Sequence, residues 1–110
     1  GVSISSDLMD VLNWCDAVNM LRVQNERMEL NYFPSNREYS QKFGLNIERM
    51  NQLRKKIVIL HPGPINRGVE ITSEVADSEQ AIILDQVENG VAIRMAIIYL
   101  LGSQINIKVT

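Results

Sequence analysis

The fold depends most on the stretch Ile57-Val58-Ile59-Leu60-His61-Pro62-Gly63-Pro64-Ile65-Asn66-Arg67-Gly68. Its first four residues are apolar, which predicts a buried strand over 57–60. Two prolines flanking a glycine then force the backbone out of a strand, so we expect a loop over 61–68. A loop at the carboxyl end of a strand in an open α/β sheet is the usual place for a ligand. The plainer alternative is a surface turn, which Pro and Gly clusters commonly form.

A second mostly apolar stretch, 17–21, predicts another strand that ends near Arg22. In extended backbone alternate side chains point the same way, so we expect Arg22 and Gln24 to project together while Val23 faces the core. A guanidinium beside an amide suits a carboxylate ligand that also carries an amino group. The alternative is that both are solvated polar residues at the start of a loop over 25–34.

Two helices are expected between these strands. Ser35 and Glu38 form a capping box that starts the first, and Gly44 can close it in the left-handed conformation. The second should cover about 46–55. The basic residues 54–56 would then stand at its carboxyl end, where cations offset the helix dipole.

The longest helix is expected after a second capping box, formed by Asp77 and Gln80. Gly90 inside it should mark a close neighbour or a break, and Gly102 should end it. Its apolar side chains recur at steps of three and four, which predicts one buried face: Leu84, Val87, Val91, Met95 and Ile98.

Shorter elements complete the pattern. We expect a strand at 2–4, a helix capped by Ser5 or Ser6, an extended link at 69–71 and a helical turn at 73–77. Helices therefore alternate with strands, which predicts the α/β class with parallel pairing. Few strands are visible, so the chain reads as part of a doubly wound parallel sheet with flanking helices.

The composition is that of an ordinary globular chain of one domain: 110 residues, 45% hydrophobic and 22% charged. A net charge of −2 gives no reason to expect nucleic acid or an anionic membrane as a partner. One cysteine and one histidine exclude an internal disulfide and a standard zinc cluster, so no metal site is expected. No signal peptide or membrane-spanning stretch is visible, and the expected compartment is the cytoplasm.

Three blocks stand in order along the chain. They are Leu21-Arg22-Val23-Gln24-Asn25-Glu26-Arg27-Met28, then His61-Pro62-Gly63-Pro64 with Asn66-Arg67-Gly68-Val69-Glu70-Ile71, then Gln86-Val87-Glu88-Asn89-Gly90-Val91 with Arg94-Met95-Ala96. Together they resemble the catalytic chain of aspartate carbamoyltransferase. The resemblance covers nearly all of the chain and matches the carboxyl-terminal part of that family's aspartate-binding domain, an incomplete Rossmann-like unit over 1–110.

The resemblance implies transfer of a carbamoyl group from carbamoyl phosphate to the amino group of L-aspartate, in pyrimidine biosynthesis, without a metal or organic cofactor. It implies that Arg22 and Gln24 hold aspartate and that backbone carbonyls of Pro62 and Gly63 meet the carbamoyl and amino groups. Gly63 stands where the family often has leucine. The segment after Gln24 resembles the family's closing loop. No catalytic residue is assigned: His61 is considered as a general base, but it resembles the start of the family's loop motif.

The chain also departs from the family. The Ser-Thr-Arg-Thr phosphate-binding motif is missing, and so are a serine and a lysine that the family borrows from a neighbouring subunit. We therefore expect a fragment that is inactive alone. By resemblance its partners would be the remainder of the catalytic chain, two further copies in a homotrimer, and a possible regulatory or dihydroorotase chain.

Three alternatives remain open. The first is an ornithine-type carbamoyltransferase, whose loop reads His-Cys-Leu-Pro and whose cationic substrate Arg22 would repel. The second is a non-catalytic α/β assembly fragment that binds a partner chain through an unpaired sheet edge. The third is a free-standing module that binds a dicarboxylate.

Overall fold

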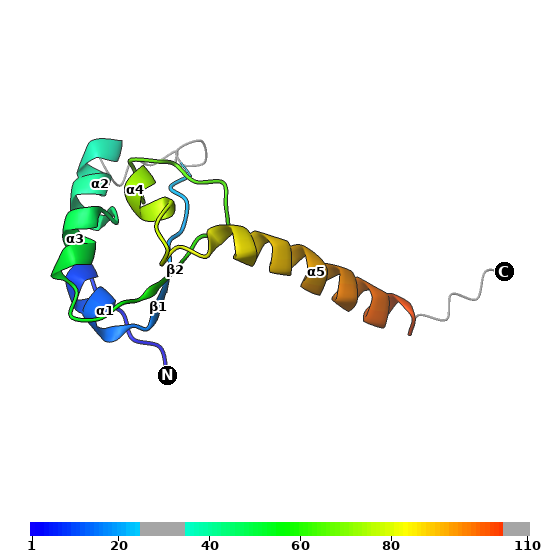
Figure 1. The fold of residues 1–110 in the computed structure, drawn as a ribbon. Coiled ribbons are helices and arrows are strands. Elements are labelled where there is room, and N and C mark those ends of the chain that lie inside the picture. The colour runs from blue at the N-terminus through cyan, green and yellow to red at the C-terminus, as the bar shows by residue number, and fades with distance from the viewer. Residues whose placement is uncertain (25–34, 105–110) are drawn as a thin grey trace.

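The computed structural model describes residues 1–24 and 35–104 of the chain (Figure 1). The loop expected at 25–34 lies outside these ranges, as do residues 105–110. The elements in chain order are α1 (Leu8–Trp14), β1 (Ala17–Asn19), α2 (Asn36–Phe43), α3 (Ile47–Gln52), β2 (Val58–Leu60), α4 (Ser73–Ala76) and α5 (Ile83–Gly102).

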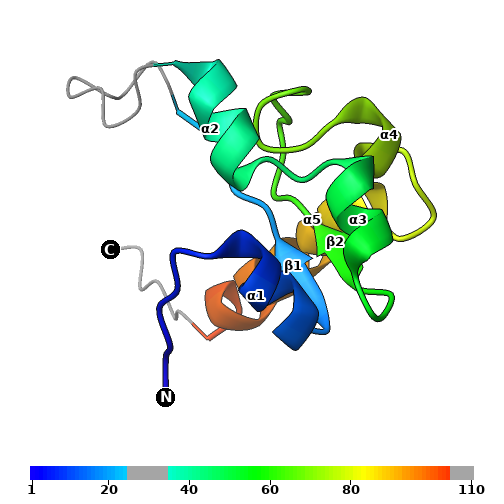
Figure 2. The ribbon, with the colours of Figure 1, turned by 90° about the vertical axis from the view of Figure 1, so that its left-hand side faces the viewer.

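The sheet is small and parallel. β1 pairs with β2 in the register Ala17 with Val58, Val18 with Ile59 and Asn19 with Leu60. On the other side of β2, Ile59 forms a parallel bridge with Ala81. Figure 2 shows the two strands side by side, with α1 and α3 in front of them and α5 behind. The predicted α/β class, with parallel pairing and flanking helices, is confirmed.

The core forms where the strands meet the helices that cover them. Ile57 and Ile59 bring apolar side chains from β2 and the residue before it. The apolar side chains with the least exposure are Leu12, Leu45, Ile59, Ile71 and Val75, each 0% exposed. They come from five separate segments, so burial of β2 holds distant parts of the chain together.

The amino-terminal predictions were partly wrong. No strand forms at 2–4, where Val2 and Ile4 are 95% and 97% exposed. The helix that follows is present, but its cap is Asp7, whose carboxylate accepts from Asp10 N at 3.1 Å. Ser5 instead accepts from Asp7 N at 3.1 Å, so the serine supports the cap rather than forming it.

Gly44 follows α2, as predicted, but for a different reason. Ser35 Oγ accepts from Glu38 N at 3.2 Å, so the predicted start of the helix is confirmed. Gly44 itself has φ −69° and ψ 137°, which is not left-handed. A Cβ there would lie 2.6 Å from the carbonyl oxygen of Ser40 and 2.7 Å from that of Val69. Glycine is required because two backbone segments approach it closely.

Gly44→Ala is therefore expected to destabilise the protein by about 2 kcal/mol, because the added methyl group must push backbone atoms apart. Gly102→Ala is the matched control, since a Cβ at Gly102 meets nothing within 4 Å. Urea denaturation of both variants measures the effect. An equal midpoint for Gly44→Ala and the wild type would contradict the close approach.

Two further helix predictions need correction at their ends. α3 stops at Gln52, earlier than expected, so residues 54–56 do not sit in its last turn. Lys55 instead pairs with Asp16 at 2.7 Å, immediately before β1. The hydrogen bond and charge of Lys55 lower the pKa of the Asp16 carboxyl. Lys55 thus links the segment before β2 to the segment before β1 through an exposed ion pair.

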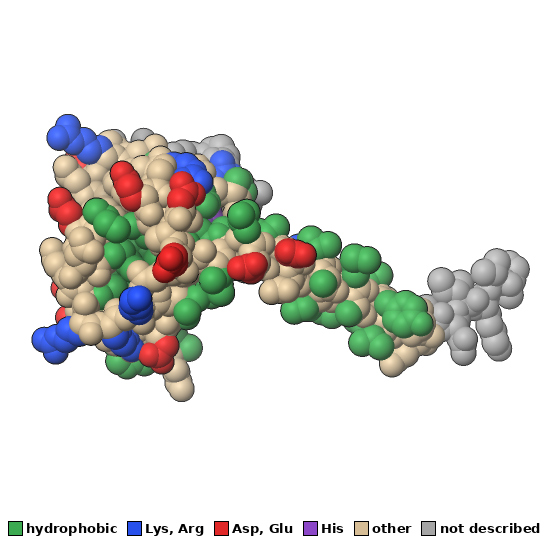
Figure 3. Space-filling view, viewed as in Figure 1, with side chains coloured by type: hydrophobic (Ala, Val, Ile, Leu, Met, Phe, Trp, Pro, Cys, Tyr) green, Lys and Arg blue, Asp and Glu red, His purple; other side chains and the backbone are tan. Residues whose placement is uncertain are grey.

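The longest helix differs most from expectation. α5 begins at Ile83 without a side-chain cap, so the capping box of Asp77 and Gln80 does not form. The helix runs unbroken through Gly90 to Gly102. It extends away from the sheet as a rod (Figure 1), and apolar side chains show along it (Figure 3). Its predicted buried face is exposed, to 84% at Leu84 and 71% at Ile98.

Among the helices of residues 1–24 and 35–104, none has both the length and the apolar character that crossing a membrane requires.

Candidate functional site

The two segments predicted to hold ligand leave the sheet at one edge. β1 and β2 are parallel, so their carboxyl ends lie together. Met20 N donates to Leu60 O at 2.8 Å, which continues the pairing to the last residue of β2. Residues 21–24 and the loop from His61 therefore start from neighbouring positions, as the two traces rising from the sheet show (Figure 1).

A side chain in the loop connects the two segments. Asn66 Nδ2 donates to the carbonyl oxygen of Val23 at 2.9 Å. Val23 is 8% exposed, whereas Arg22 is half-buried and Gln24 is exposed, in accord with the expected alternation. The hydrogen bond fixes the backbone between Arg22 and Gln24 against the proline-rich loop. The convergence of these side chains with the carbonyls of Pro62 and Gly63 on one substrate stays a prediction.

His61 is buried and fully engaged within the chain. Its side chain is 0% exposed, and Nδ1 accepts from the backbone N–H of Gly63 at 2.8 Å. The ring proton therefore belongs on Nε2, which lies 3.0 Å from Glu70 Oε1. Both ring nitrogens thus have partners within the chain. The role of His61 as a general base stays a prediction that this geometry does not favour.

Glu70 is the acceptor on which the loop converges. It is 0% exposed, and its Oε1 accepts from His61 Nε2 and from Asn66 N, the latter at 2.7 Å. From α5, Gln86 Oε1 accepts from His61 N at 2.8 Å. The sequence analysis did not single out Glu70 or Gln86. The sequence signal that could have indicated their contact was a histidine and a glutamate nine residues apart, at the two ends of one motif.

The extended link expected at 69–71 is only partly correct. Ile71 forms a parallel bridge with Leu45, but residues 68–70 form a turn, and that turn explains the placement of Glu70. Gly68 has φ +83° and its N–H donates to Ile71 O at 2.8 Å, which closes a tight turn. Val69 N donates to Asn66 O at 3.0 Å within the same turn. The chain folds back at this turn, so the side chain of Glu70 lies against the preceding loop and contacts His61 and Asn66. The predicted helical turn is confirmed as α4.

The outer side of the turn is held by an exposed ion pair. Both guanidinium nitrogens of Arg67 donate to the Asp77 carboxylate, at 3.1 and 3.0 Å. Arg67 lowers the pKa of Asp77 chiefly through these hydrogen bonds. This pairing occupies the side chain that was expected to cap α5.

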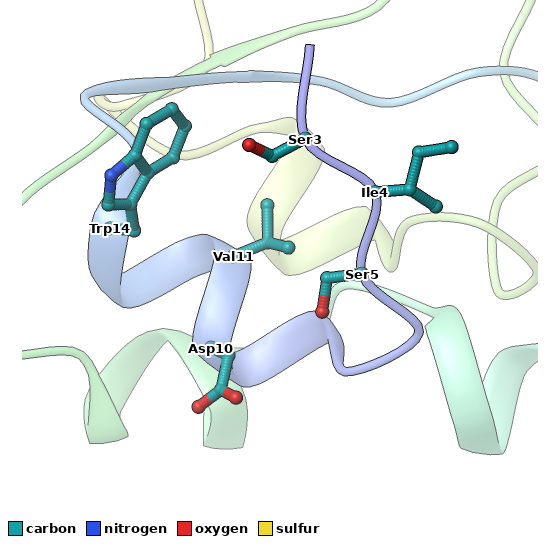
Figure 4. A pocket seen from close by; sticks show the side chains of 6 residues that line it. All are labelled: Ser3, Ile4, Ser5, Asp10, Val11 and Trp14. Carbon is teal, nitrogen blue, oxygen red and sulfur yellow. The ribbon is translucent and has the colours of Figure 1, made fainter.

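Two hollows on the described surface lie away from the predicted residues. One of about 450 Å³ lies between the loop and the start of α5, with Arg67 and Asp77 in its wall. Another, of about 300 Å³, lies between the amino-terminal segment and α1 (Figure 4). Neither includes Arg22, Gln24, Pro62 or Gly63 among its lining residues. Within residues 1–24 and 35–104, no group of three His, Cys, Asp or Glu side chains is placed to hold a metal ion.

Comparisons with known proteins identify the family to which this domain is similar. The family model described as "Aspartate/ornithine carbamoyltransferase, Asp/Orn binding domain" matches residues 1–101. The aspartate carbamoyltransferase catalytic subunit of Christiangramia forsetii is 68% identical over 105 residues, which are 96% of this chain and 34% of that protein. The subunit of the same name from Flavobacterium johnsoniae is 65% identical over the same shares. The chain thus spans about a third of the length of these curated relatives.

Solved structures share the fold. Aspartate transcarbamoylase from Trypanosoma cruzi, in complex with carbamoyl aspartate and phosphate, matches with a TM-score of 0.65 and 26% identity over 83% of this chain and 27% of that one. Anabolic ornithine carbamoyltransferase from Campylobacter jejuni matches with a TM-score of 0.69 and 21% identity, over 90% and 32%. At that identity the second likeness concerns the fold alone.

Proposed function

This chain belongs to the aspartate/ornithine carbamoyltransferase family through its Asp/Orn-binding domain, and we propose that it forms the part of an aspartate carbamoyltransferase that receives L-aspartate. In this proposal residues 1–110 are the carboxyl-terminal portion of the aspartate-binding domain. The identities of 68% and 65% to catalytic subunits with that name support aspartate as the substrate.

The observation that carries the proposal is the hydrogen bond between Asn66 and Val23. It holds an arginine and an amide against a loop rich in proline, at the carboxyl edge of a parallel sheet. Ligands of open α/β sheets bind at that edge. Arg22 is permanently charged and planar, so it suits a bidentate contact with one carboxylate of aspartate. Gln24 would complete the contact through its amide.

The loop would act on the reacting groups. In the proposed reaction the neutral amine of aspartate forms a bond to the carbamoyl carbon, and the bond from that carbon to the phosphate oxygen breaks. The amine gives up a proton, which the leaving phosphate takes. Carbonyl oxygens of Pro62 and Gly63 can accept hydrogen bonds from the amino and carbamoyl groups. Holding both groups at bonding distance on a rigid loop lowers the entropic part of the barrier.

The remainder of the site would come from outside this chain. Carbamoyl phosphate would bind to another part of the same catalytic chain, and a homotrimer would complete the site, with no metal or organic cofactor. The exposed apolar side chains along α5 support the proposal that further protein packs against this helix, because monomeric proteins rarely leave so continuous an apolar surface in water. We place this enzyme in the cytoplasm and in pyrimidine biosynthesis.

The test is a carbamoylation assay on the full-length protein with carbamoyl phosphate and either L-aspartate or L-ornithine. We expect carbamoyl aspartate to form and ornithine to be a poor substrate, since Arg22 would face the cationic end of ornithine. The isolated 110-residue chain is the control and should give no turnover. Faster carbamoylation of ornithine than of aspartate would contradict the proposal.

A further inference from the structure

We propose that Glu70 is a positioning residue: by accepting hydrogen bonds from His61 and Asn66, it sets the backbone of Pro62 and Gly63 for the substrates. The inference rests on the proposed function, and it adds a residue that the sequence analysis left without a role.

The two hydrogen bonds to Glu70 come from both ends of the loop segment that contains Pro62 and Gly63. One oxygen, Oε1, takes the Nε2 proton of His61 and the backbone N–H of Asn66, at 3.0 and 2.7 Å. These donors lie on either side of residues 62–65. A single buried atom thus fixes the distance between the two ends of the segment that carries the carbonyls.

Glu70 also determines which nitrogen of His61 carries the proton. With Nε2–H directed to Glu70, Nδ1 is left as the acceptor for the N–H of Gly63, at 2.8 Å. That hydrogen bond orients the peptide unit between Pro62 and Gly63, whose carbonyl oxygen belongs to Pro62. Loss of Glu70 would remove the preference for this tautomer and with it the fixed direction of the carbonyl.

The same network reaches the arginine segment. Asn66 donates one N–H to Glu70 and, through Nδ2, another hydrogen bond to Val23 O. A change at Glu70 therefore moves the loop and the backbone between Arg22 and Gln24 together. Both elements that would contact aspartate depend on one carboxylate.

The chemistry of Glu70 is unusual for a purely structural contact. Its side chain is 0% exposed, yet Oε2 has no hydrogen-bond partner among the residues that the structure describes, while Oε1 has two. A buried unpaired oxygen costs stability. Burial and then the charge of Glu70 raise the pKa of Tyr39 on α2. In this proposal, a buried carboxyl side chain is kept here because of the geometry it imposes on the loop.

The experiment uses the full-length protein with both substrates saturating. Glu70→Ala should lower kcat by about 100-fold, since a misplacement of about 1 Å costs that much. Glu70→Gln keeps an oxygen acceptor of the same shape and should restore kcat to within about tenfold of wild type. His61→Asn keeps the acceptor for Gly63 but loses the donor to Glu70. Glu74→Gln changes an exposed carboxylate on α4 and is the matched control, with unchanged kcat.

Because His61 and Glu70 act through one network, Glu70→Ala with His61→Asn should lose no more kcat than Glu70→Ala alone. Multiplied losses in the double variant, or wild-type kcat in a folded Glu70→Ala or His61→Asn variant, would overturn the proposal. If Glu70→Ala fails to fold, Glu70→Gln takes its place. The proposal is then supported if Glu70→Gln lowers kcat by more than its change in stability explains and if adding His61→Asn lowers kcat no further. A wild-type protein that does not carbamoylate aspartate would refute the proposed function instead.

Discussion

Arg22→Ala in the full-length protein is expected to raise the KM for L-aspartate by about 100-fold and to change kcat much less. The reason is that a bidentate, charge-assisted contact to a carboxylate contributes about 3 kcal/mol in a partly buried site, and about 1.4 kcal/mol corresponds to tenfold. A contact made equally in the ground and transition states affects KM rather than kcat. Steady-state kinetics with saturating carbamoyl phosphate measures the effect.

Two variants sharpen this result. Arg22→Lys keeps the charge but not the planar fork, so its KM should lie between those of the wild type and Arg22→Ala. Gln24→Ala should raise the KM in the same direction by less, because a neutral amide contributes a weaker hydrogen bond. An aspartate KM unchanged by Arg22→Ala would remove Arg22 from the substrate site.

The largest effect on stability is expected from Ile59→Ala. Ile59 is 0% exposed at the centre of β2 and stands in register with Val18 of β1. On the other side its N–H donates to Gln80 O and its carbonyl oxygen accepts from Ile82 N. Removing the buried side chain should lower the free energy of unfolding by about 3 kcal/mol, from lost apolar burial and the cavity left behind.

Val58→Ala is the matched control in the same strand, since Val58 is 39% exposed and should cost less than about 1 kcal/mol. Urea denaturation of the full-length variants gives both values. Equal losses at Val58 and Ile59 would show that β2 is not the buried centre on which the loop depends.

Much of the fold could be predicted from local pattern. The apolar runs at 17–21 and 57–60 predicted both strands, each slightly longer than observed, because apolar residues continue beyond the ladder, after β1 and before β2. Ser35 marked the start of α2, since capping is a contact between residues close in the sequence. The position of the loop after β2 followed from two prolines that cannot extend a ladder.

The rest depended on contacts between distant residues. Asp77 was expected to cap a helix, but Arg67, ten residues earlier, takes its carboxylate. Gly68 with φ +83° turned an alternating stretch into a tight turn and brought Glu70 beneath the loop. The apolar line of α5 has the period of a buried face, but within residues 1–24 and 35–104 nothing covers it. Periodicity identifies an apolar face and not the surface that packs against it.

Gly44 shows the same limit on a smaller scale. A glycine after a helix most often adopts a left-handed conformation, and the sequence supported that expectation. Glycine is needed for another reason: the carbonyl oxygen of Val69, 25 residues later in the chain, lies 2.7 Å from where a Cβ of residue 44 would stand. Close approach of backbone is a tertiary property that a cap motif does not encode.

The most direct measurement is a crystal structure of the full-length protein with carbamoyl aspartate and phosphate. We expect a carboxylate of the product within hydrogen-bond distance of the Arg22 guanidinium and its carbamoyl group against the carbonyls of Pro62 and Gly63, with the hydrogen bond from Asn66 to Val23 intact. Product bound away from the carboxyl edge of β1 and β2, or contacting the loop but not Arg22, would contradict the account.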